Sequence, residues 1–545
     1  MPYIQHRSLA MGISLGAVLA SAYAGPTLPR PSLTRQTPLY YYSLGGPTFN
    51  EEHLSAIGRS LKLQPQRSND GIMEIQEDGI SRGFVSRGAH AQLLVVPNLQ
   101  FLKEGLPTRE VAVRQAEGFA REMKLVPSDE GQLTLGDVNT WTRQSGAQNQ
   151  RPSAKEDMVR TVVFARKLDG LMVYGPSSSL AVNVTAMGVQ GVSDTIRQVH
   201  KTDRKVDLKP AAEARRELDP QLAMLKREKT KQSVKNLGLV YYENDGQIVQ
   251  PAYAYAVTFN GPKGQKTANM YFVAAGRNTP EKIEMPMFDG KPPVEPSKNQ
   301  RAANLFDNLY ATTKPQANPI KVGVYVVRHD DSCWLNDGWA FWSNLQHGGS
   351  PKQLRDYYWD YPWLWEDFGG TSNQSRYYGG QCHICMLEGH GLPWWMSCYE
   401  NWGDVINIWS MTGFGGNAGL GEVTAYMIRH SCEVIPAPGD PYGGNYSSGG
   451  PFDVWWHIFR GLRGTYGYRT TMAICDGVGG SYGDQISRGV PMLSSWLGIT
   501  GGLWYYHIIG WDYGSAVILA GHEGDTLYNN SPGPTPGSLT IWWNH

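Results

Sequence analysis

The sequence predicts an α/β protein in which a layered domain with a mainly parallel sheet follows smaller α+β modules. After residue 320, short apolar strands alternate with helical segments, which is typical of a parallel sheet covered by helices. Before that point, an amphipathic helix at 109–123 is followed by strands at 159–164, 171–174 and 180–185. This mixture indicates α+β modules in the first half of the chain.

A change in composition separates the two halves. All six cysteines follow residue 320, only Trp141 of the 18 tryptophans precedes it, and only Lys321 and Lys352 carry lysine beyond it. A chain of 545 residues is also too long for one hydrophobic core. We predict a signal peptide at 1–24, a first α+β module at 25–205, a second module with a linker at 206–315, an α/β domain at 316–500 and a Gly- and aromatic-rich β appendage at 501–545.

The first 24 residues predict a cleavable secretory signal. A weakly polar start is followed by a short apolar stretch at 9–20 and a small-x-small cleavage site at Ala22-Tyr23-Ala24. That stretch is too short to span a bilayer. We therefore expect a secreted, extracellular protein, and its sequons at Asn183, Asn373, Asn445 and Asn529 are compatible with a glycoprotein.

The charge balance argues against two classes of partner. Lys plus Arg and Asp plus Glu both number 49, so the net charge is zero. No long-range field would attract nucleic acid or an anionic membrane. We expect neither as a partner.

Two predicted strands end in residues that could carry chemistry. The strand at 382–387 leads to Gly389-His390-Gly391, and the strand ending at Ile428 leads to Ser431-Cys432. Functional residues collect beyond the carboxyl ends of parallel strands. A thiolate can attack a carbonyl carbon while an imidazole moves the protons, and backbone N–H groups of Gly391 and Cys432 could stabilise the oxyanion. The pattern predicts Cys432 as nucleophile and His390 as its base.

This order of motifs resembles the caspase, legumain and gingipain class of cysteine peptidases, in which a His-Gly ends one strand and a Cys ends the next. It is also similar to an uncharacterised family of secreted proteins with the same frame. The further matches lie in Trp365-Glu366-Asp367-Phe368, in Trp456, Phe459, Gly461 and Leu462, and in Gly467-Tyr468-Arg469-Thr470. The resemblance covers roughly residues 318–500 and implies a caspase-like fold, a Cys432–His390 dyad, hydrolase activity and a peptide or protein substrate.

The first half of the chain resembles the helix-plus-meander modules of secreted peptidase propeptides. Val163–Gly170 with Val173–Pro176, and Leu239–Tyr242 with Pro251–Tyr253, carry this likeness. It implies cystatin- or propeptide-like modules that inhibit the second domain within the same chain or serve as a permanent scaffold. An accessory domain without a regulatory role is an equal alternative.

Substrate selection rests on the loop after the first strand of the α/β domain. In the resembling peptidases a residue there lines the pocket for the side chain before the cleaved bond. Arg328 would favour an acidic or amide side chain, whereas Asp330 or Asp331 would favour a basic one. A solvated charged loop is the simpler interpretation of these residues.

Cys382-His383-Ile384-Cys385 allows a second chemistry. With Cys398, these side chains could supply four zinc ligands. A strand would place Cys382 and Cys385 on opposite faces, so we expect disulfides here and no metal or other cofactor. An even number of cysteines in an oxidising compartment would also allow Cys432 to be paired.

The tryptophans support a rival function. Exposed aromatic rings suit glycan binding, although tryptophan more often packs in cores. The alternative to a cysteine peptidase is therefore a catalytically inactive secreted protein that binds glycan or peptide on the same fold.

Overall fold

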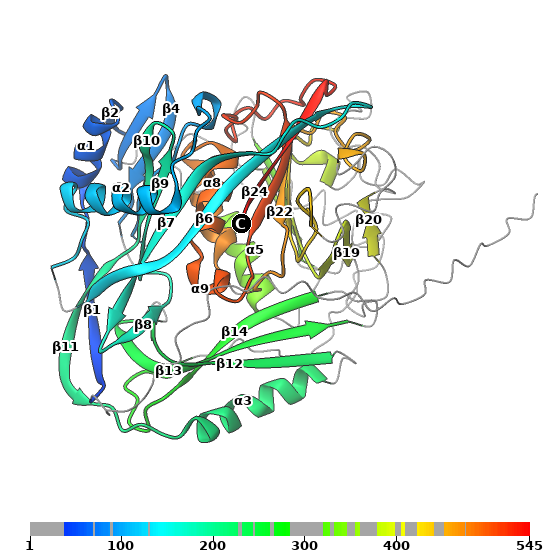
Figure 1. Ribbon diagram of the computed structural model, residues 1–545. Coiled ribbons are helices and arrows are strands. Elements are labelled where there is room, and N and C mark those ends of the chain that lie inside the picture. The colour runs from blue at the N-terminus through cyan, green and yellow to red at the C-terminus, as the bar shows by residue number, and fades with distance from the viewer. Residues whose placement is uncertain are drawn as a thin grey trace, which may run out of the picture.

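The computed structural model describes residues 38–68, 71–87, 91–128, 131–226, 231–243, 246–261, 266–283, 320–326, 332–345, 355–359, 379–397, 405–408, 422–440, 452–474 and 476–545 (Figure 1). The predicted signal peptide at 1–24 lies outside these ranges. Among the helices of the described ranges, none is both long and apolar enough to cross a membrane.

In its described residues, the first half of the chain is built from mostly antiparallel strands and three α-helices. The strands are β1 (Tyr40–Pro47), β2 (Gln64–Arg67), β3 (Met73–Glu77), β4 (Ile80–Val85), β5 (Leu93–Val95), β6 (Gln132–Ala147), β7 (Glu156–Leu168), β8 (Leu171–Tyr174), β9 (Ser179–Thr185), β10 (Gly188–Asp194), β11 (Arg197–Lys205), β12 (Lys231–Glu243), β13 (Ile248–Asn260) and β14 (Lys266–Ala274). The helices are α1 (Glu51–Ser60), α2 (Arg109–Glu122) and α3 (Ala211–Lys226).

Two layers form in this half because each helix covers a sheet with one apolar stripe. α2 begins at the Thr108 cap and buries Ala112, Ala116 and Phe119 at helical spacing against β7, β9 and β10. α3 buries Ala214, Leu218 and Leu222 against β13 and β14, beneath which it runs in Figure 1. The predicted helix at 109–123 and the predicted strands at 159–164, 171–174 and 180–185 are confirmed.

The second half adds further strands and helices. The strands are β15 (Lys321–Val326), β16 (Arg355–Trp359), β17 (Ile384–Glu388), β18 (Gly391–Leu392), β19 (Trp395–Ser397), β20 (Val405–Asn407), β21 (Tyr426–His430), β22 (Gly464–Tyr468), β23 (Gly514–Leu519) and β24 (Ser538–Asn544). The helices are α5 (Ser332–Asn344), α7 (Val478–Ser487), α8 (Met492–Gly502) and α9 (Trp504–His507).

The second half holds a run of parallel strands, whereas in the first half only a short pairing of β8 with β12 is parallel among the described strands. β16, β15, β17, β21 and β22 pair in that order, all in parallel. β23 and β24 continue the sheet antiparallel, and β24 pairs with β6 of the first half. The α/β class is confirmed, but the sheet as a whole is mostly antiparallel. The strands of residues 501–545, expected as an appendage, lie between β22 and β6 in the interior of the sheet.

The alternation of side chains along the parallel strands divides the core of the second half. Val322, Met386 and Ile428 belong to a cluster with residues of α5, α7 and α8 on one face. Leu387 and Met427 belong to a cluster with Trp455 and Phe459 on the other face. The aromatic-rich sequence at 454–462 predicts a helix, but this segment forms turns over the second face.

Candidate active site at the strand ends

The parallel register brings the two predicted catalytic residues to neighbouring strand ends. Glu388, the last residue of β17, is paired with His430, the last residue of β21. His390 and Cys432 each follow two residues beyond this pair. A Cβ atom built on Gly391 would lie 2.2 Å from the backbone oxygen of Cys432 and 2.9 Å from its nitrogen. The turn after His390 therefore lies directly against the backbone of Cys432.

The Cys432 thiol is buried and held by the loop that follows β22. Its Sγ accepts a hydrogen bond from the Met472 backbone N–H at 3.2 Å and lies 3.6 Å from the Met472 carbonyl oxygen. The residue is 1% exposed. Burial raises the pKa of the Cys432 thiol well above its ordinary value. Burial therefore favours the protonated thiol over the thiolate.

His390 is also buried, under the indole ring of α5. The ring centroids of Trp334 and His390 are 5.7 Å apart and nearly perpendicular. The same indole meets the ring of His430 edge-on at 6.4 Å. One tryptophan thus packs against both histidines at the strand ends.

We expect Gly391→Ala to disturb this site strongly. A methyl group there would meet the Cys432 carbonyl oxygen at 2.2 Å and Ser431 Oγ at 2.4 Å. Because backbone atoms must move, the free energy of unfolding should fall by about 1–3 kcal/mol. Gly498→Ala in α8 is the matched control, since its nearest neighbouring atom would lie 4.0 Å away. Urea denaturation of both variants measures the effect, and equal midpoints would contradict the close contact.

A buried cluster of acidic residues surrounds His430. Its Nδ1 lies 2.9 Å from Glu388 Oε2 and 3.5 Å from Asp337 Oδ2, and its Nε2 lies 3.4 Å from Asp476 Oδ1. The Tyr468 hydroxyl donates to Asp476 Oδ2 at 2.7 Å. Asp337 comes from α5, and both its carboxylate oxygens accept from the Gly479 N–H in the first turn of α7. The cluster therefore ties the strand ends to both helices.

Protonation offsets the charge of this cluster. Burial opposes the imidazolium form, but the attraction of Glu388, Asp476 and Asp337 outweighs it and raises the pKa of His430 well above its ordinary value. Burial, reinforced by the other carboxylates, raises the pKa of Glu388 and of Asp337. The folded chain consequently holds protons here that the unfolded chain would release near neutral pH.

The same donor atoms could hold a cation. One ligand atom from each of Asp337, His430 and Asp476 lies within 4.8 Å of the others. Two carboxylates and an imidazole are a ligand set that suits a divalent metal such as Zn²⁺ or Fe²⁺. Sequence reasoning missed this cluster because its members come from four separate segments. Only the spacing of Glu388 and His430 from the predicted strand ends could have drawn attention to it.

The disulfides expected at Cys382 and Cys385 do not form, and the predicted substrate-binding residues lie outside the described part of the chain. No disulfide is present in the described part of the chain, where Cys385 and Cys432 are buried thiols. Cys382 precedes β17, so strand alternation does not separate it from Cys385, and both lie in one apolar cluster. The Lys321 backbone N–H donates to His383 Nδ1 at 2.8 Å, which occupies one of the nitrogens proposed for zinc. Arg328, Asp330 and Asp331 lie outside the described residues, as do Cys398 and Cys475.

The two sequons in the described part of the chain differ in the burial of their asparagine side chains. Asn183 is buried in β9, where its Oδ1 accepts from the Thr161 hydroxyl at 2.8 Å. A glycan on this side chain would not fit the folded structure. Asn529 is exposed, and its Oδ1 accepts from the Thr526 N–H at 2.8 Å. Asn373 and Asn445 lie outside the described residues.

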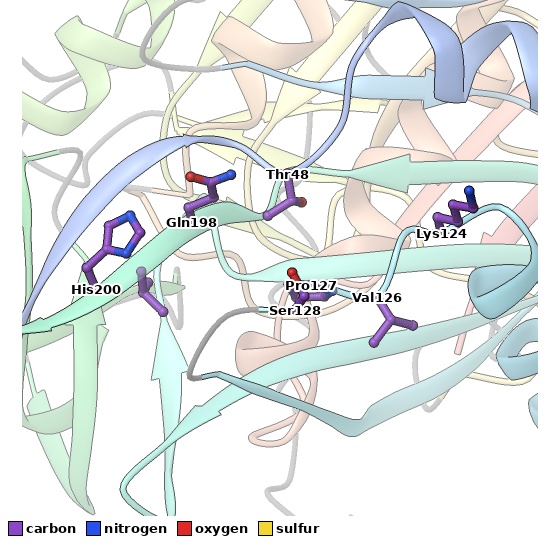
Figure 2. Close-up of a pocket in the computed structure, with 8 residues that line it drawn as sticks. Thr48, Lys124, Val126, Pro127, Ser128, Gln198 and His200 are labelled. Carbon is purple, nitrogen blue, oxygen red and sulfur yellow. The ribbon is translucent and has the colours of Figure 1, made fainter.

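A surface pocket lies elsewhere, in the first half of the chain. Figure 2 shows side chains from Thr48 directly after β1, from β11 and from the segment after α2 around it. It is lined by Thr48, Lys124, Val126, Pro127, Ser128, Gln198, Val199 and His200. None of the candidate catalytic residues contributes to it, so it gives no support to a substrate site.

Comparisons with known proteins leave the family of this chain open. No protein-family model and no curated protein matches the sequence. Among solved structures, an uncharacterized protein from Eubacterium rectale is similar at 9% identity with a TM-score of 0.31. That match covers 46% of this chain and 86% of the other. A similarity at this level carries no argument about fold or function.

Proposed function

We propose that this chain is a secreted cysteine peptidase-like protein of the caspase, legumain and gingipain class, with Cys432 as nucleophile and His390 as base. The observation that carries the proposal is the Glu388–His430 register of β17 and β21. It puts His390 and Cys432 at equivalent positions beyond two adjacent parallel strands. That is the arrangement that the resemblance of the sequence leads us to expect.

The proposed reaction cleaves a peptide bond in two steps. His390 takes the proton of the Cys432 thiol, and the sulfur adds to the carbonyl carbon. The C–N bond then breaks, the imidazole gives its proton to the leaving amine, and a thioester remains. Water, or a second amine in a transfer reaction, releases the acyl group and returns a proton to the sulfur. The backbone N–H groups of Gly391 and Cys432 are the candidates for stabilising the oxyanion.

The experiment is covalent labelling of the full chain with short peptides that carry a thiol-reactive ketone. We expect mass spectrometry to find the label on Cys432, and Cys432→Ala to abolish it. His390→Ala should slow labelling by about 10²–10⁴-fold, the usual contribution of a general base. Cys385→Ala is the matched control, since Cys385 is an equally buried thiol on a neighbouring strand. Labelling of Cys385 at the same rate as Cys432 would contradict a special role for Cys432.

A catalytically inactive binding protein is the second candidate, and two observations favour it. The Cys432 thiol is buried with a raised pKa, whereas active cysteines are thiolates. Trp339 of α5 is 51% exposed and stacks on Trp342 at 4.7 Å, an arrangement that suits a sugar ring. Under this alternative, no peptide probe labels Cys432, and Trp339→Ala reduces binding to a glycan array.

A further inference from the structure

The first residues of β14, in the first half of the chain, contact the candidate active site. Lys266, the first residue of β14, is paired antiparallel with Gly391, directly after His390. Two residues on, Ala268 forms a parallel bridge with Ala473 and accepts a hydrogen bond from the Ile474 N–H at 2.9 Å. Met472, next to Ala473, holds the Cys432 thiol. One end of β14 therefore pairs with the turn after His390 and with the loop that holds the Cys432 thiol.

The side chain of Lys266 reaches the residue next to the nucleophile. Its Nζ lies 2.6 Å from Glu433 Oε1. The other carboxylate oxygen of Glu433, Oε2, is buried and has no hydrogen-bond partner among the residues that the structure describes. A carboxylate with one buried oxygen left over can accept a second donor, as the planar guanidinium of arginine provides. The φ angle of Glu433 is +57°, so the turn after Cys432 holds this side chain in an unusual backbone conformation.

We infer that Glu433 is the recognition site for a basic side chain of an extended peptide, and that β14 occupies this site with Lys266 as an internal substitute. The inference rests on the proposed function. Extended peptides bind by adding a strand to an exposed edge, with main-chain hydrogen bonds for affinity and a side-chain pocket for specificity. β14 makes both kinds of contact at Gly391, Ala473 and Glu433.

Both proposed catalytic residues are buried in the state in which β14 is docked. With β14 in place, Cys432 and His390 are 1% and 3% exposed. A peptide strand can pair with Gly391 and Ala473 only after the end of β14 leaves them. The substrate class that follows is a peptide or protein with lysine or arginine beside the cleaved bond, and β14 must be displaced or removed before cleavage.

Charge reversal in the full chain tests the inference. Lys266→Glu replaces an attraction by a repulsion, so the rate of Cys432 labelling by a lysine-terminated ketone should rise on the order of ten-fold. Glu433→Lys should also open the site, but a glutamate-terminated probe should then react faster than the lysine probe. The double variant restores the pair with reversed charges, and its labelling rate should return toward that of the wild type.

The matched control is Lys201→Glu. Lys201 lies 3.5 Å from Asp169 and its side chain is 34% exposed, against 32% for Lys266. Its reversal should leave the labelling of Cys432 unchanged. Amide hydrogen exchange at Ile474 supplies a readout that does not depend on activity, because this N–H is bonded to Ala268 only while β14 is docked.

Two failures are distinguishable. If Cys432 is labelled in the wild type but Lys266→Glu alters neither that rate nor the exchange at Ile474, the internal substitute is wrong and the peptidase proposal stands. If exchange at Ile474 rises while no probe ever labels Cys432, β14 is displaceable but the peptidase proposal fails. Faster labelling by the glutamate probe in Lys266→Glu would overturn the assignment of Glu433.

Discussion

His430→Ala is expected to lower the free energy of unfolding by about 3–5 kcal/mol, the cost of removing one partner from a fully buried charged group. The imidazole stands between Glu388 Oε2 at 2.9 Å and Asp476 Oδ1 at 3.4 Å. Without it, the buried carboxylates at the ends of β17 and before α7 repel one another. Urea denaturation at neutral pH measures the loss.

The matched control is His522→Ala. His522 also pairs with a carboxylate, Asp525, at 3.0 Å, but its side chain is 26% exposed. Because water screens that pair, we expect a loss below about 1 kcal/mol. Equal losses in the two variants would show that the buried cluster contributes nothing beyond an ordinary surface pair.

The cluster also predicts how stability depends on pH. The pKa values of Glu388, Asp337 and His430 are all raised in the folded chain, so the folded state binds more protons than the unfolded state. Stability therefore falls as pH rises above about 4, where unfolded carboxylates begin to ionise. In His430→Ala the fall should be steeper, since protons on the carboxylates are then the remaining means of neutralising them.

A divalent cation bound between Asp337, His430 and Asp476 would reverse the pH dependence of stability. Ligands must be deprotonated to bind metal, so cation-bound protein gains stability as pH rises. Denaturation midpoints at pH 5 and pH 8, each with zinc and with a chelator, separate the two states. If the denaturation midpoint measured with the chelator rises with pH, the folded cluster does not bind more protons than the unfolded chain.

Trp542→Ala is expected to cost about 3–5 kcal/mol, as for other large aromatic residues removed from a core. Trp542 is fully buried in β24, which pairs with β23 on one side and with β6 on the other. Its neighbour Trp543 packs in the cluster on the opposite face of the sheet. A cavity at this position weakens the strand that joins the two halves of the chain. Deletion of residues 538–545 should therefore prevent folding.

Trp339→Ala is the control for this prediction. Trp339 is 51% exposed, so its removal should change stability by less than about 1 kcal/mol. Thermal or urea denaturation of both variants gives the comparison. A small effect of Trp542→Ala would mean that β24 is not needed to hold β23 against β6.

Local pattern was sufficient for most single elements. The apolar spacing of 109–123 predicted α2, and the β-branched run after residue 320 predicted β15. Local pattern gave the wrong element where pairing or packing with a neighbouring element decided the conformation. The side-chain pattern of residues 352–359 predicts a helix, yet Arg355–Trp359 forms β16 because its backbone pairs with β15. The aromatic segment at 452–462 forms turns because it covers the face of the sheet that carries Leu387 and Met427.

The sequence by itself determined the order of strands and motifs, and hence that His390 and Cys432 each follow an apolar strand. Only the tertiary structure decided that these strands are neighbours in parallel register, that Asp337 and Asp476 converge on His430, and that Lys266 of β14 reaches Glu433. The physical reason is that alternation along a strand is local and readable, whereas pairing and charge contacts depend on which distant segments bury their apolar faces together.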